Sequence, residues 1–242
     1  MESPKSDIRK WFRNQFRWHV IPFWNKWMKL LLSKKAKLTI KGRDNRVQSF
    51  RSSGKSRILV QGDNNRVSID QTLNSHSVII EIRGNNNNIS ISEGVRIDNI
   101  NIYISGVDCS FEIAKETYVS SAQCIVGEEN SRMFIGERCM IASGVEIRTS
   151  DSHGIFELGT KCRINHAKDV KVENDVWLAN QVLLLKGAVI PEGSVVGARS
   201  VVTGRLAEKN AVYAGNPARL IRRNALWGWV TDHFPEHKTL AK

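Results

Sequence analysis

The sequence has few cysteines, no long apolar run and no export signal. Its four cysteines have neither Cys-x-x-Cys spacing nor a nearby His cluster, which excludes a zinc site of the usual kind. We expect them to be small buried residues in a reducing compartment. No window of about 18 apolar residues predicts a transmembrane helix. Residues 1–6 lack an apolar signal core and basic residues interrupt residues 7–17, so we expect a cytoplasmic protein.

Basic charge is concentrated at the N-terminus. Residues 1–43 contain twelve Lys or Arg and two acids, which leaves a net +2 of the total +12 for the remaining chain. A nucleic-acid-binding protein would instead carry basic residues across a recognisable binding fold. The sequence therefore predicts no nucleic-acid partner.

Residues 7–33 are predicted to form two amphipathic helices interrupted by Pro22. Ile8, Trp11, Phe12 and Phe16 follow helical spacing, and four of the seven tryptophans fall in this segment among basic residues. Such helices suit peripheral contact with an anionic membrane surface. The alternative, which the sequence leaves open, is a helix that packs across the end of the main domain.

From residue 38 the pattern changes to short alternating β segments. Three similar stretches begin at Leu38, Ser56 and Val78, and their glycines are Gly42, Gly62 and Gly84. Each stretch has a strand, a Gly-Asx turn and a second strand, and glycine and asparagine tolerate the backbone of a tight corner. Repeats of this length indicate a solenoid whose coils stack on one another, with irregular coils up to residue 130.

Near the C-terminus a repeat of six residues appears. The aliphatic members are Leu178, Leu184, Ile190, Val196 and Val202, and the small members are Val182, Ala188, Ser194 and Ser200. A period of six fits neither a flat strand nor an α-helix, and it indicates coils with three short faces. We expect the aliphatic residues inside and the small residues at the corners.

These stretches resemble the hexapeptide-repeat O-acetyltransferases, in particular those that act on capsule, O-antigen or sialic acid polysaccharides. The resemblance rests on residues 149–153 (TSDSH), 163–170 (RINHAKDV), 175–179 (DVWLA), 185–190 (LKGAVI), 195–203 (VVGARSVVT) and 214–219 (AGNPAR). It implies an all-β, left-handed parallel β-helix with N-terminal amphipathic helices and a short C-terminal helical tail. The handedness comes from the resemblance alone.

The resemblance implies that His153 is the catalytic base, because it stands 24 residues before Trp177 as in that family. A hydroxyl becomes a good nucleophile only when a base removes its proton, and imidazole can do this near neutral pH. His166 is the nearby competitor. The Trp177 indole N–H could stabilise the oxyanion or hold the thioester, or the ring could simply pack at a corner. Asp151, Glu157 and Asn165 are candidates to orient His153 or bind the acceptor.

The same resemblance implies acetyl-coenzyme A as the donor, bound between neighbouring solenoids of a homotrimer, and no metal. Ala179, Asn180 and Ala198 would follow the pantetheine arm. The phosphate end would meet Thr203, Arg205, Pro217, Arg219 and Arg222. Two residues depart from the family pattern: Ala179 replaces a glycine, and Gly204 replaces a lysine whose phosphate contact Arg205 could supply.

The predicted activity is acetyl transfer to a sugar hydroxyl of a bacterial surface polysaccharide or its precursor, at the inner membrane face. Two alternatives remain open: N-acylation of a nucleotide amino sugar, and a noncatalytic solenoid scaffold. The predicted organisation is a basic Trp-rich segment (1–37), irregular coils (38–130), a catalytic β-helix (131–223) with an acceptor loop (148–166), and a tail (224–242).

Overall fold

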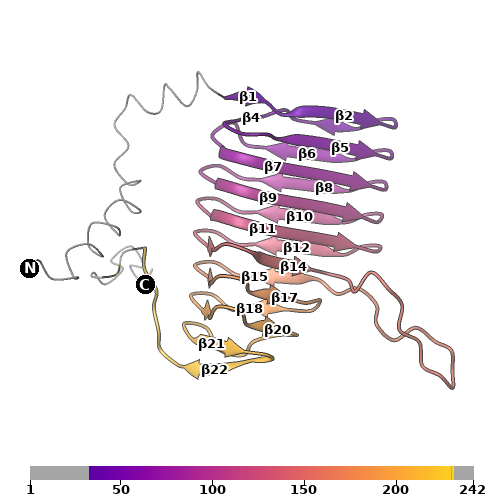
Figure 1. Ribbon diagram of the computed structural model, residues 1–242. Helices are drawn as coiled ribbons and strands as arrows, with labels where there is room; N and C mark the ends of the chain where they lie inside the picture. Colours follow the sequence, from indigo (N-terminus) through magenta and orange to yellow (C-terminus); the bar gives the residue numbers. More distant parts are fainter. Residues whose placement is uncertain (1–32, 230, 232–242) are drawn as a thin grey trace, which may run out of the picture.

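The computed structural model describes residues 33–229 and residue 231 as a single parallel β-solenoid (Figure 1). Apart from Ser33, the helices predicted in residues 7–33 lie outside the described residues. Strands begin at Lys34, four residues before the predicted start of the solenoid. Within the described part of the chain there is no helix, and so none that could cross a membrane.

The coils place their strands in parallel stacks, one strand per coil. The seven-stranded sheet contains β3 (Arg46–Val47), β6 (Arg66–Ile69), β8 (Asn88–Ile91), β10 (Ser110–Ile113), β12 (Arg132–Ile135), β15 (Val170–Val172) and β18 (Val189–Ile190). The main path of the larger sheet contains β2 (Lys37–Lys41), β5 (Arg57–Gln61), β7 (Asn74–Arg83), β9 (Arg96–Ser105), β11 (Tyr118–Gly127), β13 (Met140–Ile141), β16 (Trp177–Leu178), β19 (Val195–Val196), β21 (Val212–Gly215) and β22 (Ala218–Arg222). A third stack branches from β11 and contains β14 (Val145–Arg148), β17 (Leu183–Leu184) and β20 (Val201–Val202). Antiparallel pairs close both ends, β1 (Lys34–Lys35) with β4 (Arg51–Ser52) and β21 with β22.

The coils before residue 130 are regular, whereas the sequence predicted irregular ones. Strands β7, β9 and β11 pair in one continuous register. The corner asparagines stack with a period of 22 residues, as Asn87 Nδ2 donates to Asn65 Oδ1 of the preceding coil over 3.0 Å. The regular period of these coils is hard to see in the sequence because only the inward residues and the corner residues repeat, while the outward residues vary.

Glycines at the corners let one coil lie directly on the next. At Gly84, φ is +137°, and a Cβ atom would lie 1.8 Å from the carbonyl oxygen of Gly106 in the following coil. No other residue type fits such a close backbone approach. The Gly-Asx turns read from the sequence are therefore the stacking points of the solenoid.

The cross-section changes at β11. The start of this strand pairs with β13 and its later part pairs with β14, so two short strands continue one long strand. Coils after β11 consequently have three short faces. The predicted six-residue pattern is confirmed here, because all five aliphatic members and all four small members are buried.

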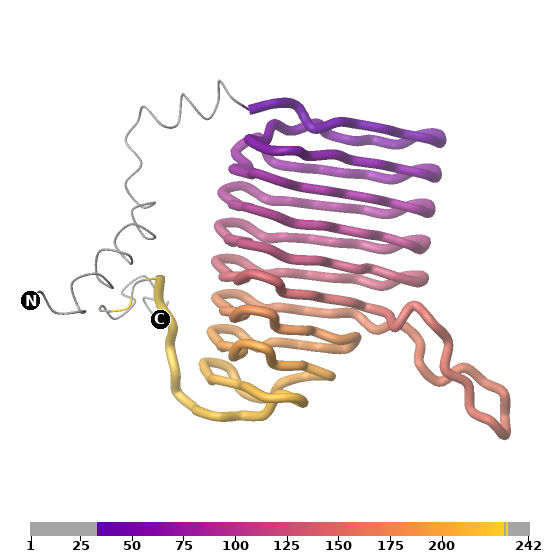
Figure 2. Tube along the Cα trace, in the orientation of Figure 1, coloured from indigo at the N-terminus to yellow at the C-terminus, as the bar shows by residue number. Residues whose placement is uncertain are grey.

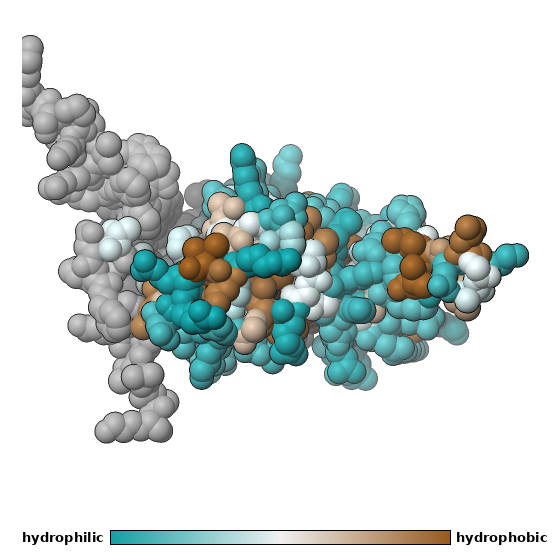
Figure 3. All heavy atoms as spheres, turned by 90° about the horizontal axis from the view of Figure 1, so that it is seen from below, coloured by the Kyte–Doolittle hydropathy of each residue, from teal (hydrophilic) through white to brown (hydrophobic). Residues whose placement is uncertain are grey.

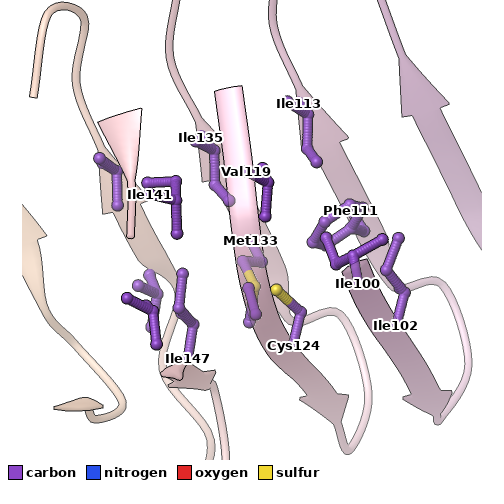
Figure 4. Close-up of a cluster of buried hydrophobic side chains, with 14 of the residues drawn as sticks. Ile100, Ile102, Phe111, Ile113, Val119, Cys124, Met133, Ile135, Ile141 and Ile147 are labelled. Atoms are coloured by element: carbon purple, nitrogen blue, oxygen red, sulfur yellow. The ribbon is translucent and has the colours of Figure 1, made fainter. Parts of the chain in front are cut away.

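A single column of apolar side chains fills the solenoid from end to end. Figure 4 shows Ile100 and Ile102 of β9 beside Phe111 of β10, with Cys124 and Met133 of the next coil following. Burial raises the pKa of the Cys124 thiol to about 12, so this sulfur stays protonated and inert. Cys109 and Cys139 are also buried, but the prediction was wrong for Cys162, which is exposed on a projecting loop.

The segment after β22 turns back along the outside of the solenoid (Figure 2). The amide of Ala225 donates to the carbonyl of Asn210 over 2.7 Å, and the Trp227 indole N–H donates to the carbonyl of Asp175 over 2.6 Å. These bonds hold residues 224–229 against earlier coils. A helix was predicted in the tail, but residues 224–229 contain none, and residues 232–242 lie outside the described part.

Candidate active site

The connection between β14 and β15, residues 149–169, projects from the solenoid and is called the arm below (Figures 1 and 2). It contains most of the predicted acceptor loop. Phe156 and Arg163 form an antiparallel bridge, and the amide of Ile164 donates to the carbonyl of Ile155 over 2.9 Å. These contacts make the outer part of the arm a short hairpin.

An ion pair ties the base of the arm to the preceding coil. The Arg163 guanidinium donates to both oxygens of the Glu128 carboxylate, over 2.7 and 2.9 Å, and the Ser150 hydroxyl donates to the same carboxylate over 2.5 Å. Arg163 thereby lowers the pKa of Glu128 to about 2. Glu128 lies just after β11, so this pair fixes the arm against the coil before it.

Asn165 is the buried centre of a second polar cluster. Its Nδ2 donates to Asp151 Oδ2 over 2.7 Å and to the carbonyl of His153 over 2.8 Å, while its Oδ1 accepts from the amide of Ile155 over 2.6 Å. Lys186 donates to Asp151 and lowers the pKa of that carboxyl group. The backbone on both sides of His153 is therefore fixed, and its side chain is left exposed to solvent.

Of the three candidate orienting residues, the structure brings two together. Asp151 and Asn165 bond to each other next to His153, with Asp151 engaged by Asn165 and Lys186. Glu157 lies at the tip of the arm, where its carboxylate accepts from the Thr160 hydroxyl over 2.6 Å. Its hydrogen bond therefore closes the hairpin turn.

Sequence reasoning missed Glu128, Arg163 and Lys186. The one sequence signal for Glu128 is weak: it stands 22 residues after Gly106 and takes the corner position that Gly62, Gly84 and Gly106 occupy in the earlier coils. Among the described residues, fifteen residues other than glycine have a positive φ, so this angle alone does not single out Glu128. Within the described residues, no three His, Cys, Asp or Glu side chains gather as a metal site.

Trp177 lies at a different corner, next to the returning C-terminal segment. Trp177 is 37% exposed, and its ring centroid is 6.2 Å from that of Trp227. Trp227 is anchored to Asp175, whose carboxylate is bound by Arg138 over 3.0 and 3.1 Å. The corner formed by residues 173–177 is called the tryptophan corner below.

The predicted donor-binding residues are distributed around the last coils. Asn180 and Ala198 line a hollow of about 460 Å³ at the corner between β16 and β17, while neighbouring Ala179 is buried. Thr203 and Arg205 follow β20 on the side of the arm. Pro217, Arg219 and Arg222 are exposed on the terminal hairpin of β21 and β22.

Within one chain, His153 and Trp177 lie at opposite ends of the same face. The arm leaves the coil just before β15, and Trp177 follows after the turn at the far end of that strand. Figure 1 shows the arm and the returning C-terminal segment on opposite sides of the solenoid. The structure therefore does not bring these two predicted catalytic residues together within one chain.

Comparison with proteins of known structure identifies the family. No family model matches the chain. The crystal structure of the polysialic acid O-acetyltransferase OatWY superposes with a TM-score of 0.73, at 31% identity over 84% of this chain and 96% of that chain. The chain belongs to the polysialic acid O-acetyltransferase family. A second structure, the polysialic-acid-specific acetyltransferase NeuO, superposes with a TM-score of 0.71 at 28% identity over 81% of this chain and 90% of that chain.

Two curated polysialic acid O-acetyltransferases match part of the chain. The protein of Neisseria meningitidis is 40% identical over 126 residues, which is 52% of this chain and 58% of the relative. The protein of Escherichia coli O1:K1 / APEC is 50% identical over 93 residues, which is 38% of this chain and 30% of the relative. The chain thus spans less than two thirds of either curated relative.

The ion pair at the base of the arm predicts an acid-sensitive contribution to stability. We expect Glu128→Gln to lower the free energy of unfolding by about 1 to 3 kcal/mol at neutral pH, because Arg163 loses a charged partner. The pKa of Glu128 falls from 4.5 to about 2 on folding, so the stabilisation is complete above pH 4.5 and disappears as the pH falls toward 2. Urea titrations at neutral pH and in this acid range would measure both effects.

The matched control is Glu81→Gln, because Glu81 pairs with Arg83 on the same strand and links no coils. It should change the free energy of unfolding by less than about 0.5 kcal/mol. Equal losses in the two variants would show that the Glu128–Arg163 pair has no special role at the arm.

Proposed function

We propose that the protein is an acetyl-coenzyme A-dependent O-acetyltransferase that modifies a sugar hydroxyl of a bacterial capsule or O-antigen polysaccharide, or of its precursor. The observation that carries the proposal is the fixed and exposed position of His153, in a chain of the polysialic acid O-acetyltransferase family. Asn165 holds its backbone carbonyl over 2.8 Å, and the side chain faces solvent on the arm. The names of the relatives support a sialic acid polymer as the acceptor class.

The reaction follows from the chemistry of an alcohol and a thioester. The His153 imidazole removes the proton of the acceptor hydroxyl as its oxygen attacks the carbonyl carbon of the acetyl thioester. The carbon–sulfur bond then breaks, the acetyl group stays on the sugar oxygen, and coenzyme A leaves as the thiol. In this mechanism the Trp177 indole N–H would lie near the developing oxyanion, where a hydrogen-bond donor stabilises negative charge.

The proposal includes a homotrimer with left-handed coils and with active sites between subunits. The arm carries Ile155, Phe156, Leu158 and Ile164 as exposed apolar side chains, with Leu158 95% exposed. Figure 3 shows apolar atoms gathered at the projecting end of the molecule. Isolated soluble chains rarely expose such clusters, which supports contact with the tryptophan corner of a neighbouring subunit.

The donor would lie between the same two subunits. The hollow beside Asn180 and Ala198 suits a narrow pantetheine arm. Arg205, Arg219 and Arg222 are exposed, and guanidinium groups bind phosphates with good geometry. Thr203 and Pro217 would accompany the nucleotide end. We place the enzyme in the cytoplasm, where acetyl-coenzyme A is made, and at the inner membrane face.

A coupled assay tests the reaction class. The full-length protein is incubated with acetyl-coenzyme A and either sialic acid polymer or a nucleotide amino sugar, and free thiol is measured. We expect thiol release with the polymer and a product whose acetyl group is removed by mild alkali, as an ester requires. Release only with the nucleotide amino sugar, and an alkali-stable product, would identify an N-acyltransferase instead.

A further inference from the structure

The first coils of the solenoid carry a dense and exposed positive charge. Residues 33–66 contain ten Lys or Arg and two Asp, for a net charge of +8. All ten basic side chains are exposed. We call this part of the molecule the basic end; it lies at the top of Figure 1, around β2 and β5.

Like charges lie side by side at the basic end. Lys37 of β2 is in register with Arg57 of β5, and Arg46 of β3 is in register with Arg66 of β6. Within residues 33–66, the ion pair is that of Arg43 with Asp63, over 3.7 Å. Like charges on neighbouring strands repel each other, so these pairs do not stabilise the fold. They are suited to a partner of opposite charge.

The charge does not continue toward the arm. The next coils, residues 67–131, contain three Lys or Arg and nine Asp or Glu, for a net charge of −6. One hollow is lined by Asp70, Glu93 and Glu112 of these coils and by Glu137 just after them, together with Lys115. A polyanionic chain that ran from the basic end to His153 would cross this acidic belt. The charge pattern therefore favours a partner that meets the end of the solenoid alone.

Two apolar side chains are exposed among the charges. Leu38 and Ile40, both on β2, are 41% and 40% exposed because β2 is the outermost strand of its sheet. The chain enters this end at Ser33, directly after a sequence that contains seven Lys or Arg, two acids and four tryptophans in residues 1–32. Apolar and basic side chains together are typical of surfaces that bind anionic lipid.

We propose that the basic end is a docking face for an anionic lipid surface. The solenoid would then stand on the membrane with β2 toward the headgroups. Five coil steps separate β2 from β14, where the arm begins, and at the strand spacing of about 4.8 Å this holds the arm roughly 24 Å from the lipid. That separation leaves room for an acceptor chain to pass between the arm and the membrane.

Binding of the full chain to vesicles tests the proposal. The variant Lys37→Gln/Lys41→Gln/Arg57→Gln/Arg66→Gln removes four charges from the basic end. The matched control Lys115→Gln/Arg132→Gln/Lys171→Gln/Lys209→Gln removes four exposed charges elsewhere. Binding is measured to vesicles of phosphatidylcholine alone and of phosphatidylcholine mixed with phosphatidylglycerol. Melting temperature and acetyl transfer to a short soluble acceptor report folding and the proposed activity separately.

We expect wild-type protein to bind only the phosphatidylglycerol vesicles, and more weakly as salt is added. The basic-end variant should weaken this binding at least about tenfold, and the control less than about threefold. Equal weakening in both variants would overturn the proposal. So would unchanged vesicle binding in the basic-end variant; a raised KM for polymeric acceptor alone would then assign this face to the saccharide.

Discussion

Replacing His153 with alanine is expected to lower kcat for acetyl transfer by about 10²- to 10⁴-fold, the range that a general base contributes. The structure gives a reason to expect a clean loss. Asn165 holds the backbone carbonyl of residue 153, which alanine retains, and the imidazole itself is exposed. The melting temperature should therefore stay that of the wild type. Thiol release from acetyl-coenzyme A, measured with saturating acceptor, gives kcat directly.

The matched control is His166→Ala, since His166 is also an exposed histidine of the arm. It should retain kcat within about threefold, because the proposed mechanism gives the His166 side chain no part in the reaction. Full activity in His153→Ala would contradict the proposed mechanism even if the fold and family stand. A loss only in His166→Ala would transfer the role of base to that residue.

The repeat pattern predicted the interior of the later coils well, because burial there depends on position alone. Leu178 and its equivalents at every sixth residue lie inside, and Ser194 and Ser200 lie buried at corners. The earlier coils were harder to read, since their 22-residue period is carried by inward side chains and by corner residues that change from Gly106 to Glu128. A corner position that accepts both glycine and glutamate is hard to recognise as part of a repeat in a single sequence.

The site was predictable as a set of residues but not as an arrangement. The spacing of His153 and Trp177 along the chain says nothing about which corner each occupies, and their corners are set by where the arm leaves the coil. The Glu128–Arg163 pair joins residues 35 apart, a contact that depends on the register of β11 against β14. Glu157 shows the opposite case: it is only four residues from His153 in the sequence, yet it lies at the tip of the arm, away from the Asn165 cluster.

Mixing two inactive variants should restore activity if the site lies between subunits. We expect His153→Ala and Trp177→Ala each to be nearly inactive when purified alone. Co-expression would form trimers in which the arm of one subunit supplies His153 and the tryptophan corner of its neighbour supplies Trp177. With random assembly, about a quarter of the interfaces would carry both intact residues, so roughly a quarter of wild-type activity should return.

The double variant His153→Ala/Trp177→Ala, co-expressed with wild type, provides the control for this experiment. It places both defects on one chain, so an interface is intact only when neither of its chains is the variant. At equal amounts about a quarter of the interfaces are again intact, but here wild-type chains supply both residues. Activity that stays absent in the mixed single variants, with this control active, would mean that both residues act within one chain. Because the returning C-terminal segment packs Trp227 against Trp177 on the side opposite the arm, such a result would require a large movement of the arm across β15.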